Sequence, residues 1–326
     1  MPTQHTRDGP ATRASRGALG ALLAASLACA GAPSRRAVYV VDEPDLLAEG
    51  IAWDAAQRAL FVGSIMRGAI FRLPESGRAQ LFAGGLLPVL GLRVDAARGL
   101  LWAATNAEPG TAAAADPATS GRSELVALDL RTGVVRRKLS LSDGHKHLLN
   151  DVAVGDDGTV YVTDSEAGAV LRAAGGGDLR TFVPAGALDY PNGIAFARAR
   201  LYVAHSPGLV IAAPDGSTRA VGVAPGVDPR AVDGLYPCGG GLLGVQSAHR
   251  PPRITRFHLD GSGERIIASR LVAKDPDRLP LPTTGALDGA DLLVVANSDV
   301  DALGPQGLLP GSRPTTRILR FENVCT

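Results

Sequence analysis

Residues 150–164 read NDVAVGDDGTVYVTD and contain two short apolar runs on either side of a turn. Apolar and polar residues alternate in each run, which predicts two β-strands, and the Asp-Asp-Gly between them is typical of a tight turn. The pattern recurs at intervals of roughly 40 to 60 residues, and a repeat of that length indicates a supersecondary unit. The six units open with a variable residue followed by a small residue and an apolar alternation: EGIAW (49–53), LGLRV (90–94), NDVAV (150–154), NGIAF (192–196), DGLYP (233–237) and TGALD (284–288).

Further apolar runs complete most of the units, as in GAIFRLP (68–74) and RAQLFAG (78–84). Four strands in about 40 residues make a propeller blade, so the six units predict an all-β, six-bladed β-propeller. The last unit is one strand short, and AVYVVDE (37–43) is therefore predicted to supply its outer strand and close the ring. Residues 106–122 and 274–283 are predicted insertions within blades.

The composition fits one globular, turn-rich unit. The 326 residues include 40 glycines and 23 prolines, and a net charge of +1 gives no electrostatic case for binding nucleic acid. The sequence has no GxxxxGK(S/T), HExxH or CxxC motif and no GxSxG between a strand and a helix. Nucleotide hydrolysis, zinc peptidase and α/β-hydrolase chemistry therefore lack support. We expect a monomer.

The first 36 residues differ in composition from the rest. Arginines precede the apolar run ALGALLAASLACA (18–30), which has the layout of a secretory signal peptide and is too short for a permanent membrane span. We therefore predict an export segment over residues 1–36 and a propeller over residues 37–326. The mature protein is expected in the periplasm, on the cell surface or outside the cell.

The three cysteines fall in two settings. Cys29 follows small residues at the end of the apolar run, which resembles a bacterial lipoprotein cleavage site, although Ser26 stands where leucine is expected. Lipid anchoring at Cys29 and ordinary cleavage nearby both stay open, and such an anchor is the one expected link to a membrane. Cys238 and Cys325 form an even pair, which suits either a disulfide from blade five to the C-terminus or two unpaired apolar residues.

The variable residue of each unit occupies one phase of the repeat. In a propeller that phase places one side chain per blade at one mouth of the central channel, so Glu49, Asn150, Asn192 and Asp233 are predicted to converge. Two carboxylates and two amide oxygens suit Ca²⁺, and the lack of imidazole and thiolate argues against a structural zinc site. Asn-Gly and Asp-Gly also form turns, but glutamate has no such advantage before glycine.

These residues carry a family resemblance. The segments AEGIAWD (48–54), LLNDVAVGDDGTVYVTDS (148–165), YPNGIAF (190–196) and VDGLYP (232–237) resemble motifs of the regucalcin/gluconolactonase family, also called luciferin-regenerating enzyme-like, and more distantly the paraoxonases. The resemblance covers about residues 45 to 320. It implies a six-bladed propeller and one divalent cation held by the four residues at the matching positions. The cation is expected to be Ca²⁺, or alternatively Zn²⁺ or Mn²⁺.

The sequence departs from these families on the substrate side. Leu148 stands where sugar-lactone members carry an arginine, and Leu90 and Ala107 stand near the positions of a histidine pair in paraoxonases. Leu90 and Leu148 therefore predict an apolar rim beside the metal, and we expect hydrophobic lactones or esters as substrates. His147, just before the first asparagine, and His205, at a strand end, are further candidates for contact with substrate.

The predicted function is that of an exported, metal-dependent lactonase or esterase. The cation would polarise the carbonyl of a lactone or ester, and Asp233 is the candidate general base, with a role as ligand alone equally open. The alternative is a non-catalytic propeller that binds a small molecule or protein and uses a structural Ca²⁺.

Overall fold

The computed structural model describes residues 35–326 except 42, 44, 76–77, 142 and 313. The predicted export segment, with Cys29, lies almost wholly outside the described residues, and the described residues form one compact unit. No helix in the described ranges has the length and apolar character that a membrane crossing needs.

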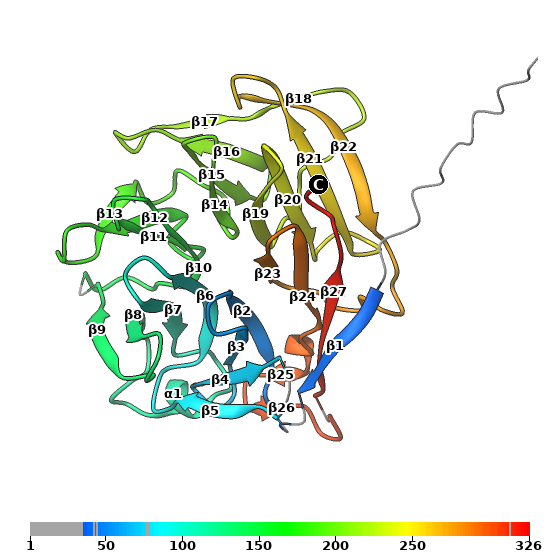
Figure 1. The fold of residues 1–326 in the computed structure, drawn as a ribbon. Coiled ribbons are helices and arrows are strands. Elements are labelled where there is room, and N and C mark those ends of the chain that lie inside the picture. Colours follow the sequence, from blue (N-terminus) through cyan, green and yellow to red (C-terminus); the bar gives the residue numbers. More distant parts are fainter. Residues whose placement is uncertain (1–34, 42, 44, 76–77, 142, 313) are drawn as a thin grey trace, which may run out of the picture. The chain divides into compact units, whose positions relative to one another are not determined.

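Six sheets of four or more strands form this unit (Figure 1), as the repeat predicts. Sheet one contains β2 (Ala48–Asp54), β3 (Ala59–Ser64), β4 (Ala69–Pro74) and β5 (Gln80–Ala83). Sheet two contains β6 (Val89–Asp95), β7 (Leu100–Asn106), β8 (Ser123–Asp129) and β9 (Val135–Leu139). Sheet three contains β10 (Leu149–Val154), β11 (Val160–Asp164), β12 (Ala169–Ala173) and β13 (Arg180–Val183).

Sheets four to six complete the ring. Sheet four contains β14 (Ile194–Ala197), β15 (Arg200–His205), β16 (Gly208–Ala212) and β17 (Thr218–Ala220). Sheet five contains β19 (Gly234–Cys238), β20 (Gly241–Gln246), β21 (Arg253–Leu259) and β22 (Arg265–Ala273), with the short β18 (Gly222–Val223) parallel to β22. Sheet six contains β23 (Gly285–Asp288), β24 (Asp291–Asn297), β27 (Thr316–Phe321) and β1 (Arg35–Val41).

The sixth sheet confirms the predicted ring closure. Strand β1, drawn in blue in Figure 1, pairs antiparallel with β27, drawn in red, as the outermost strand. It begins at Arg35, two residues before the predicted start. Each of six hydrophobic clusters lies between neighbouring sheets, and the cluster of Trp53, Leu293 and Ile318 joins sheet six to sheet one. Burial of these apolar side chains between sheets is what holds the blades together.

The glycine that follows the variable residue is explained by contact between blades. The inner strands β2, β6, β10, β14, β19 and β23 contact one another in ring order. A Cβ atom on Gly50 would lie 1.8 Å from the carbonyl oxygen of Leu90, and one on Gly91 would lie 2.0 Å from that of Asn150. The chain therefore uses glycine where two backbones approach too closely for a side chain.

Gly91→Ala is expected to lower the free energy of unfolding by about 3 kcal/mol, because the added methyl group would overlap a backbone oxygen that cannot move alone. Denaturant unfolding measures the difference. Gly261→Ala is the matched control, since nothing lies within 4 Å of the added atom, and it should change stability by less than about 0.5 kcal/mol. Equal effects of the two substitutions would contradict the steric explanation.

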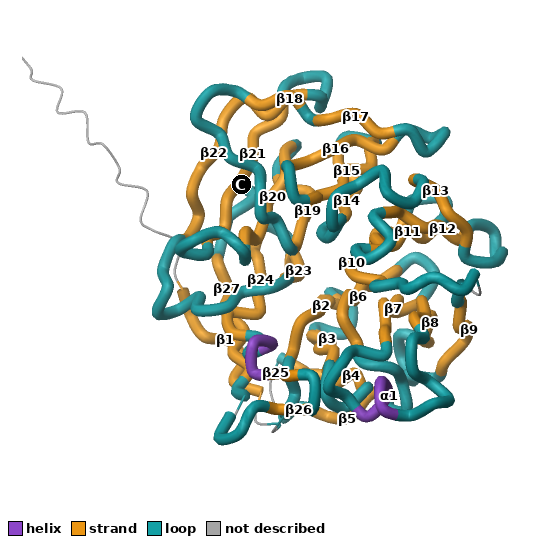
Figure 2. Tube along the Cα trace, turned by 180° about the vertical axis from the view of Figure 1, so that it is seen from behind, coloured by secondary structure: helices purple, strands orange, loops and turns teal. Residues whose placement is uncertain are grey.

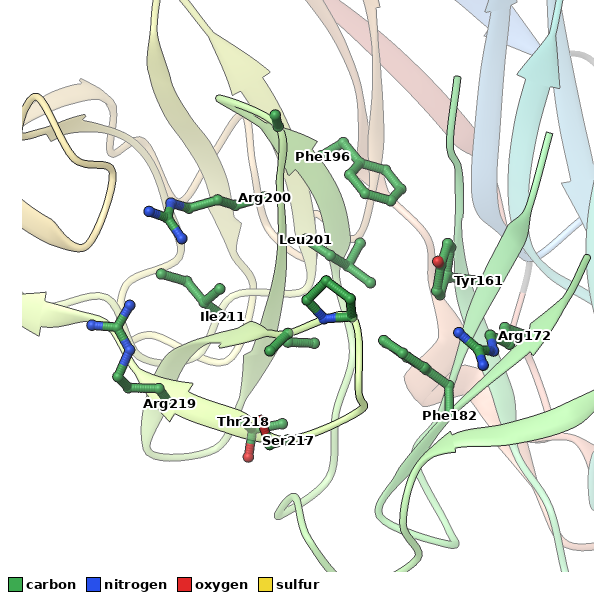
Figure 3. Close-up of a pocket in the computed structure, with 14 residues that line it drawn as sticks. Tyr161, Arg172, Phe182, Phe196, Arg200, Leu201, Ile211, Ser217, Thr218 and Arg219 are labelled. Atoms are coloured by element: carbon green, nitrogen blue, oxygen red, sulfur yellow. The ribbon is translucent and has the colours of Figure 1, made fainter. Parts of the chain in front are cut away.

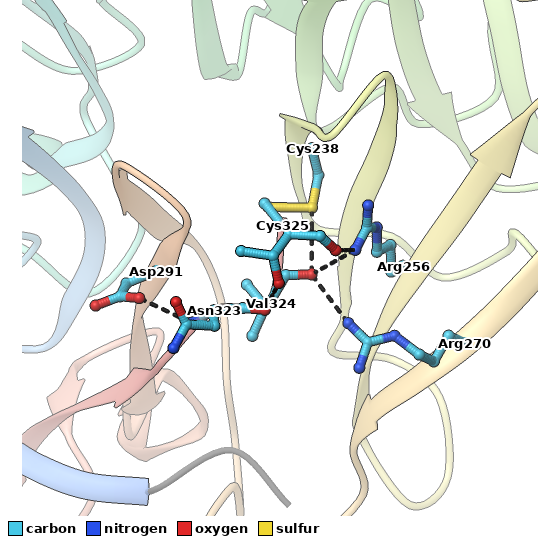
Figure 4. The surroundings of a disulfide bond; sticks show 8 residues. Cys238, Arg256, Arg270, Asp291, Asn323, Val324 and Cys325 are labelled. Carbon is cyan, nitrogen blue, oxygen red and sulfur yellow. Dashed lines mark hydrogen bonds between the residues drawn. A yellow bond between two sulfur atoms is a disulfide. The ribbon is translucent and has the colours of Figure 1, made fainter. Parts of the chain in front are cut away.

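A disulfide ties the C-terminus to sheet five (Figure 4). Cys238 on β19 is bonded to Cys325, with Cα atoms 4.8 Å apart. Beside it the carbonyl oxygen of Val324 accepts hydrogen bonds from Arg256 Nη1 at 3.2 Å and Arg270 Nη2 at 3.0 Å. Of the two arrangements open to this cysteine pair, the structure contains the bridge.

Two insertions interrupt the blades, and only the first of them was predicted from the sequence. Residues 274–283, predicted as an insertion within a blade, instead connect sheet five to sheet six, because they run from β22 to β23. The alanine-rich residues 106–122 include α1 (Ala112–Ala115), a short exception to the all-β pattern. The additional insertion lies between β24 and β27 and carries η1 (Val300–Ala302), β25 (Leu303–Gly304) and β26 (Gly307–Leu308). It contacts the first insertion, since a Cβ atom on Gly110 would lie 2.0 Å from the carbonyl oxygen of Gly304. Figure 2 shows α1, β25 and β26 on one face of the unit.

Candidate metal centre

The four oxygen donors predicted from the repeat line one cavity of about 330 Å³. Glu49 is on β2 and Asn150 on β10, whereas Asn192 and Asp233 lie just before β14 and β19. Each donor comes from a different blade, at the inner strand. Asn150 and Asp233 are buried, while Glu49 and Asn192 are partly exposed.

Hydroxyl groups hold the backbone at these positions. Thr283 Oγ1 donates to the carbonyl oxygen of Glu49 at 3.0 Å, and Thr284 Oγ1 donates to the same atom at 2.5 Å. Thr163 Oγ1 donates to the carbonyl oxygen of Asn192 at 2.8 Å. Thr284, the variable residue of the sixth unit, therefore supports a neighbouring donor.

Two of the carboxyl groups that line the cavity, those of Glu49 and Asp233, are costly to ionise. Loss of solvent around the carboxyl group raises the pKa of Glu49 well above its usual value, and the nearby Asp233 and Glu108 raise it further. Loss of solvent also raises the pKa of Asp233 to about 6, although hydrogen bonds with the side chains of Ser247 and Asn192 oppose the shift. A cation between the carboxylates would remove this penalty.

Two buried oxygens of the cavity have no hydrogen-bond partner within the described part of the chain. They are Oδ1 of Asn192 and Oδ1 of Asp233, and buried acceptors of this kind need a donor, a water molecule or a cation. The amide nitrogen of Asn150, Nδ2, donates a hydrogen bond to Ser165 Oγ at 3.1 Å. This bond does not use the amide oxygen, which is therefore available for other contacts. Among the described residues no three His, Cys, Asp or Glu side chains cluster as a metal site. The present set, half of it amide oxygen, suits a hard cation.

Several residues that line the cavity were not predicted from the sequence. They are Ile65, Glu108, Tyr190, Ser247, Ala248, Arg250, Leu281, Pro282, Thr283, Val300, Asp301 and Leu303. Only the serine among these residues, Ser247, occupies a position that recurs in the repeat. Serine ends the second apolar run of several units, and the hairpin turns that serine back beside the opening residue, as Ser165 lies beside Asn150 and Ser247 beside Asp233. No repeat position marks the exposed Arg250.

The predicted substrate-side residues separate into two groups. Leu90 and Leu148 belong to one apolar cluster with Leu47 and Ile65, close to the metal cavity. Neither His147 nor His205 lines that cavity. His205 ends β15, and burial lowers its pKa.

His147 is held between two carboxylates. Its Nδ1 lies 2.5 Å from Asp164 Oδ2, and its Nε2 lies 2.9 Å from Asp143 Oδ1. Burial alone would lower the pKa of His147, but the two carboxylates raise it above its ordinary value. Both ring nitrogens are therefore occupied, which leaves the side chain no free nitrogen for a hydrogen bond with a substrate.

A further cavity of about 520 Å³ lies between sheets three and four (Figure 3). Aromatic rings of Tyr161, Phe182 and Phe196 form one side. Arg200 and Arg219 on the other side both pair with Glu264. None of the predicted site residues lines this cavity.

No protein-family model matches the chain, and no curated protein matches its sequence. Solved structures share its fold. A PQQ-bound aldose sugar dehydrogenase from Streptomyces coelicolor is 16% identical, with a TM-score of 0.61 over 88% of this chain and 98% of that one. A gluconolactonase from Xanthomonas campestris is 18% identical, with a TM-score of 0.59 over 89% and 90%.

Regucalcin from Agrobacterium tumefaciens, described as a calcium-binding protein, is 18% identical, with a TM-score of 0.58 over 87% of this chain and 92% of that one. Sequence identities this low establish the propeller fold and leave the activity open. The similar structures include both a gluconolactonase and a regucalcin, the two kinds of protein that the sequence motifs resemble.

Proposed function

We propose that this protein is a divalent-metal-dependent hydrolase of lactones or esters. The observation that carries the proposal is the set of four oxygen donors from four blades, two of them buried acceptors without a partner, around one cavity. Glu49, Asn150, Asn192 and Asp233 would hold the cation. When bound, a divalent cation supplies Lewis acidity to a carbonyl oxygen.

Asp233 has the properties of either a ligand or a general base. Its Oδ1 has no hydrogen-bond partner among the described residues and can accept a proton from an attacking water molecule. The Ser247 side chain forms a hydrogen bond with its carboxylate, which fixes the direction of the group.

The apolar residues around the cavity support hydrophobic substrates. Ile65, Val300 and Leu303 line the cavity and belong to the same apolar cluster as Leu90 and Leu148. A hydroxyl group of an aldonolactone that faced these three side chains would lose its hydrogen bonds to water, at a cost of roughly 1 to 3 kcal/mol. Alkyl-substituted lactones or esters are therefore the proposed substrate class.

The similar solved structures support the same class of chemistry. One is a gluconolactonase, and the regucalcin is described as a calcium-binding protein. Ca²⁺ is the proposed cation because two carboxylates and two amides are hard oxygen donors, with Zn²⁺ or Mn²⁺ as the alternatives. The Cys238–Cys325 disulfide supports export, since disulfides persist in oxidising compartments. We further propose that the exported protein is a monomer.

A non-catalytic propeller with a structural Ca²⁺ is the second candidate. Two observations favour it. Leu148 stands where sugar-lactone enzymes carry an arginine, and both ring nitrogens of His147 are occupied, so neither side chain can form a hydrogen bond with a substrate. Both candidate functions use the same four residues to bind the cation, and only the first includes hydrolysis of a substrate.

Chelation separates the two candidates. We expect EDTA to reduce hydrolysis of a panel of lactones and aryl esters by the purified protein at least tenfold, because a polarising cation supplies several kcal/mol of transition-state stabilisation. Ca²⁺, Zn²⁺ and Mn²⁺ are then added back one at a time, and Ca²⁺ should restore the rate. Mg²⁺ is the control, since it demands a nearly ideal octahedral site. Hydrolysis that EDTA leaves unchanged would exclude the proposal, and Ca²⁺ binding without any hydrolysis would favour the second candidate.

A further inference from the structure

A larger cavity of about 890 Å³ adjoins the metal cavity. Its volume lies within the range of pockets that hold drug-sized molecules. Glu108 lines both cavities, so the two meet at this residue. The cavity is formed mainly by the insertion over residues 106–122, and Pro305 and Gln306 of the insertion between β24 and β27 complete it.

About half of the residues that line this second cavity are apolar or glycine. Helix α1 has no buried residue, and its Ala112, Ala114 and Ala115 line the cavity. Leu148 lines it on the side of sheet three and also belongs to the apolar cluster beside the metal cavity. Ile65 of that cluster lines the metal cavity, so one apolar cluster contributes side chains to both cavities.

Several polar side chains of the second cavity already have partners or face water. Arg122 pairs with Glu124 at 2.8 Å, and both ring nitrogens of His147 are occupied. Lys146 and Glu166 are exposed. Glu108, Ser120 and Gln306 also line the cavity. The alanines and Leu148 are therefore the part of the lining that an apolar ligand can contact without leaving polar groups unpaired.

We propose that the second cavity binds the alkyl or acyl chain of a substrate whose lactone or ester group lies at the metal cavity. The inference rests on the proposed function and adds to it a chain-binding site built by two insertions. It accounts for the alanine-rich composition of residues 106–122: small apolar side chains leave room for a chain and offer it a surface without hydrogen-bonding groups.

The test is a series of lactones that differ only in the length of an unbranched alkyl substituent. Each methylene group that enters the cavity should raise kcat/KM by about two- to fourfold, as expected for burial of a methylene group. Ala115→Trp should reduce kcat/KM for the long-chain lactones by about tenfold or more and leave that for the unsubstituted ring unchanged. Ala118→Trp is the matched control: Ala118 is also exposed but does not line the cavity, and the variant should behave as the wild type.

Binding without turnover gives a second readout. A long-chain alkyl lactam, which is not hydrolysed, should bind the EDTA-treated wild type and Ala118→Trp more tightly than Ala115→Trp in calorimetry. Chain-independent kcat/KM, or equal binding by all three proteins, would overturn the chain-binding site. Metal-dependent hydrolysis of the unsubstituted lactone could still be observed in that case, so failure of this inference is distinguishable from failure of the proposed function.

Discussion

Asp233→Asn is expected to lower kcat/KM for lactone hydrolysis by about 10²- to 10⁴-fold, the range that a positioned general base contributes. The substitution keeps the size of the side chain and one oxygen but removes the charge and the basic Oδ1. That oxygen is buried and has no partner within the described ranges, so replacing it by an amide nitrogen breaks no hydrogen bond seen in the structure. The measurement is steady-state kinetics together with calorimetric titration of Ca²⁺.

The same variant decides between the two roles of Asp233. If saturating Ca²⁺ restores the hydrolysis rate of Asp233→Asn, Asp233 is a ligand alone. If the rate stays low although the metal site is saturated with Ca²⁺, Asp233 is the general base. Asp178→Asn is the control for loss of one negative charge, because Asp178 is exposed in the turn between β12 and β13. It should change kcat/KM by less than about twofold, as expected for a screened surface charge. An Asp233→Asn protein with normal turnover and normal Ca²⁺ affinity would exclude both roles.

Loss of the Cys238–Cys325 disulfide is expected to lower the free energy of unfolding by about 4 kcal/mol. The bond closes a loop with a sequence separation of 87 residues, and a loop of that size restricts the unfolded chain strongly. Urea unfolding of the double variant Cys238→Ala/Cys325→Ala against the wild type measures the difference. Addition of a reductant supplies the control: it should destabilise the wild type by a similar amount and leave the double variant unchanged.

The C-terminus also has hydrogen bonds that do not depend on the disulfide, and these reduce the loss of stability expected when the bond is removed. The hydrogen bonds of Arg256 and Arg270 with the carbonyl oxygen of Val324 remain available after the bond is removed. If these contacts held the terminus by themselves, the double variant would lose less than about 1 kcal/mol, and the bridge would be unimportant for stability.

The repeat made most of the fold predictable. A period-two apolar pattern specifies a strand and the face it buries, and six recurrences specify six similar sheets. The missing strand of the last unit led directly to β1, which pairs with β27 as expected. The repeat also gave the phase of the four oxygen donors, and the structure places all four at one cavity.

The substrate side was much less predictable. His147 sits three residues before Asn150 in the sequence, yet its ring is held by Asp143 and Asp164 and does not line the metal cavity. The insertion between β24 and β27 gave no repeat signal, although Leu303 from it lines the metal cavity. Arg250 was not anticipated for the same reason, since it lies in a connection and not in a strand.

The sequence by itself determined the blade count, the closing strand and the ring of oxygen donors, because each follows from local alternation repeated at a regular interval. Only the tertiary structure decided which loops meet above that ring, which side chains already have partners, and that a second cavity adjoins the first. Those features depend on contacts between insertions that have no common period, such as the contact of Gly110 with Gly304, so no local pattern encodes them.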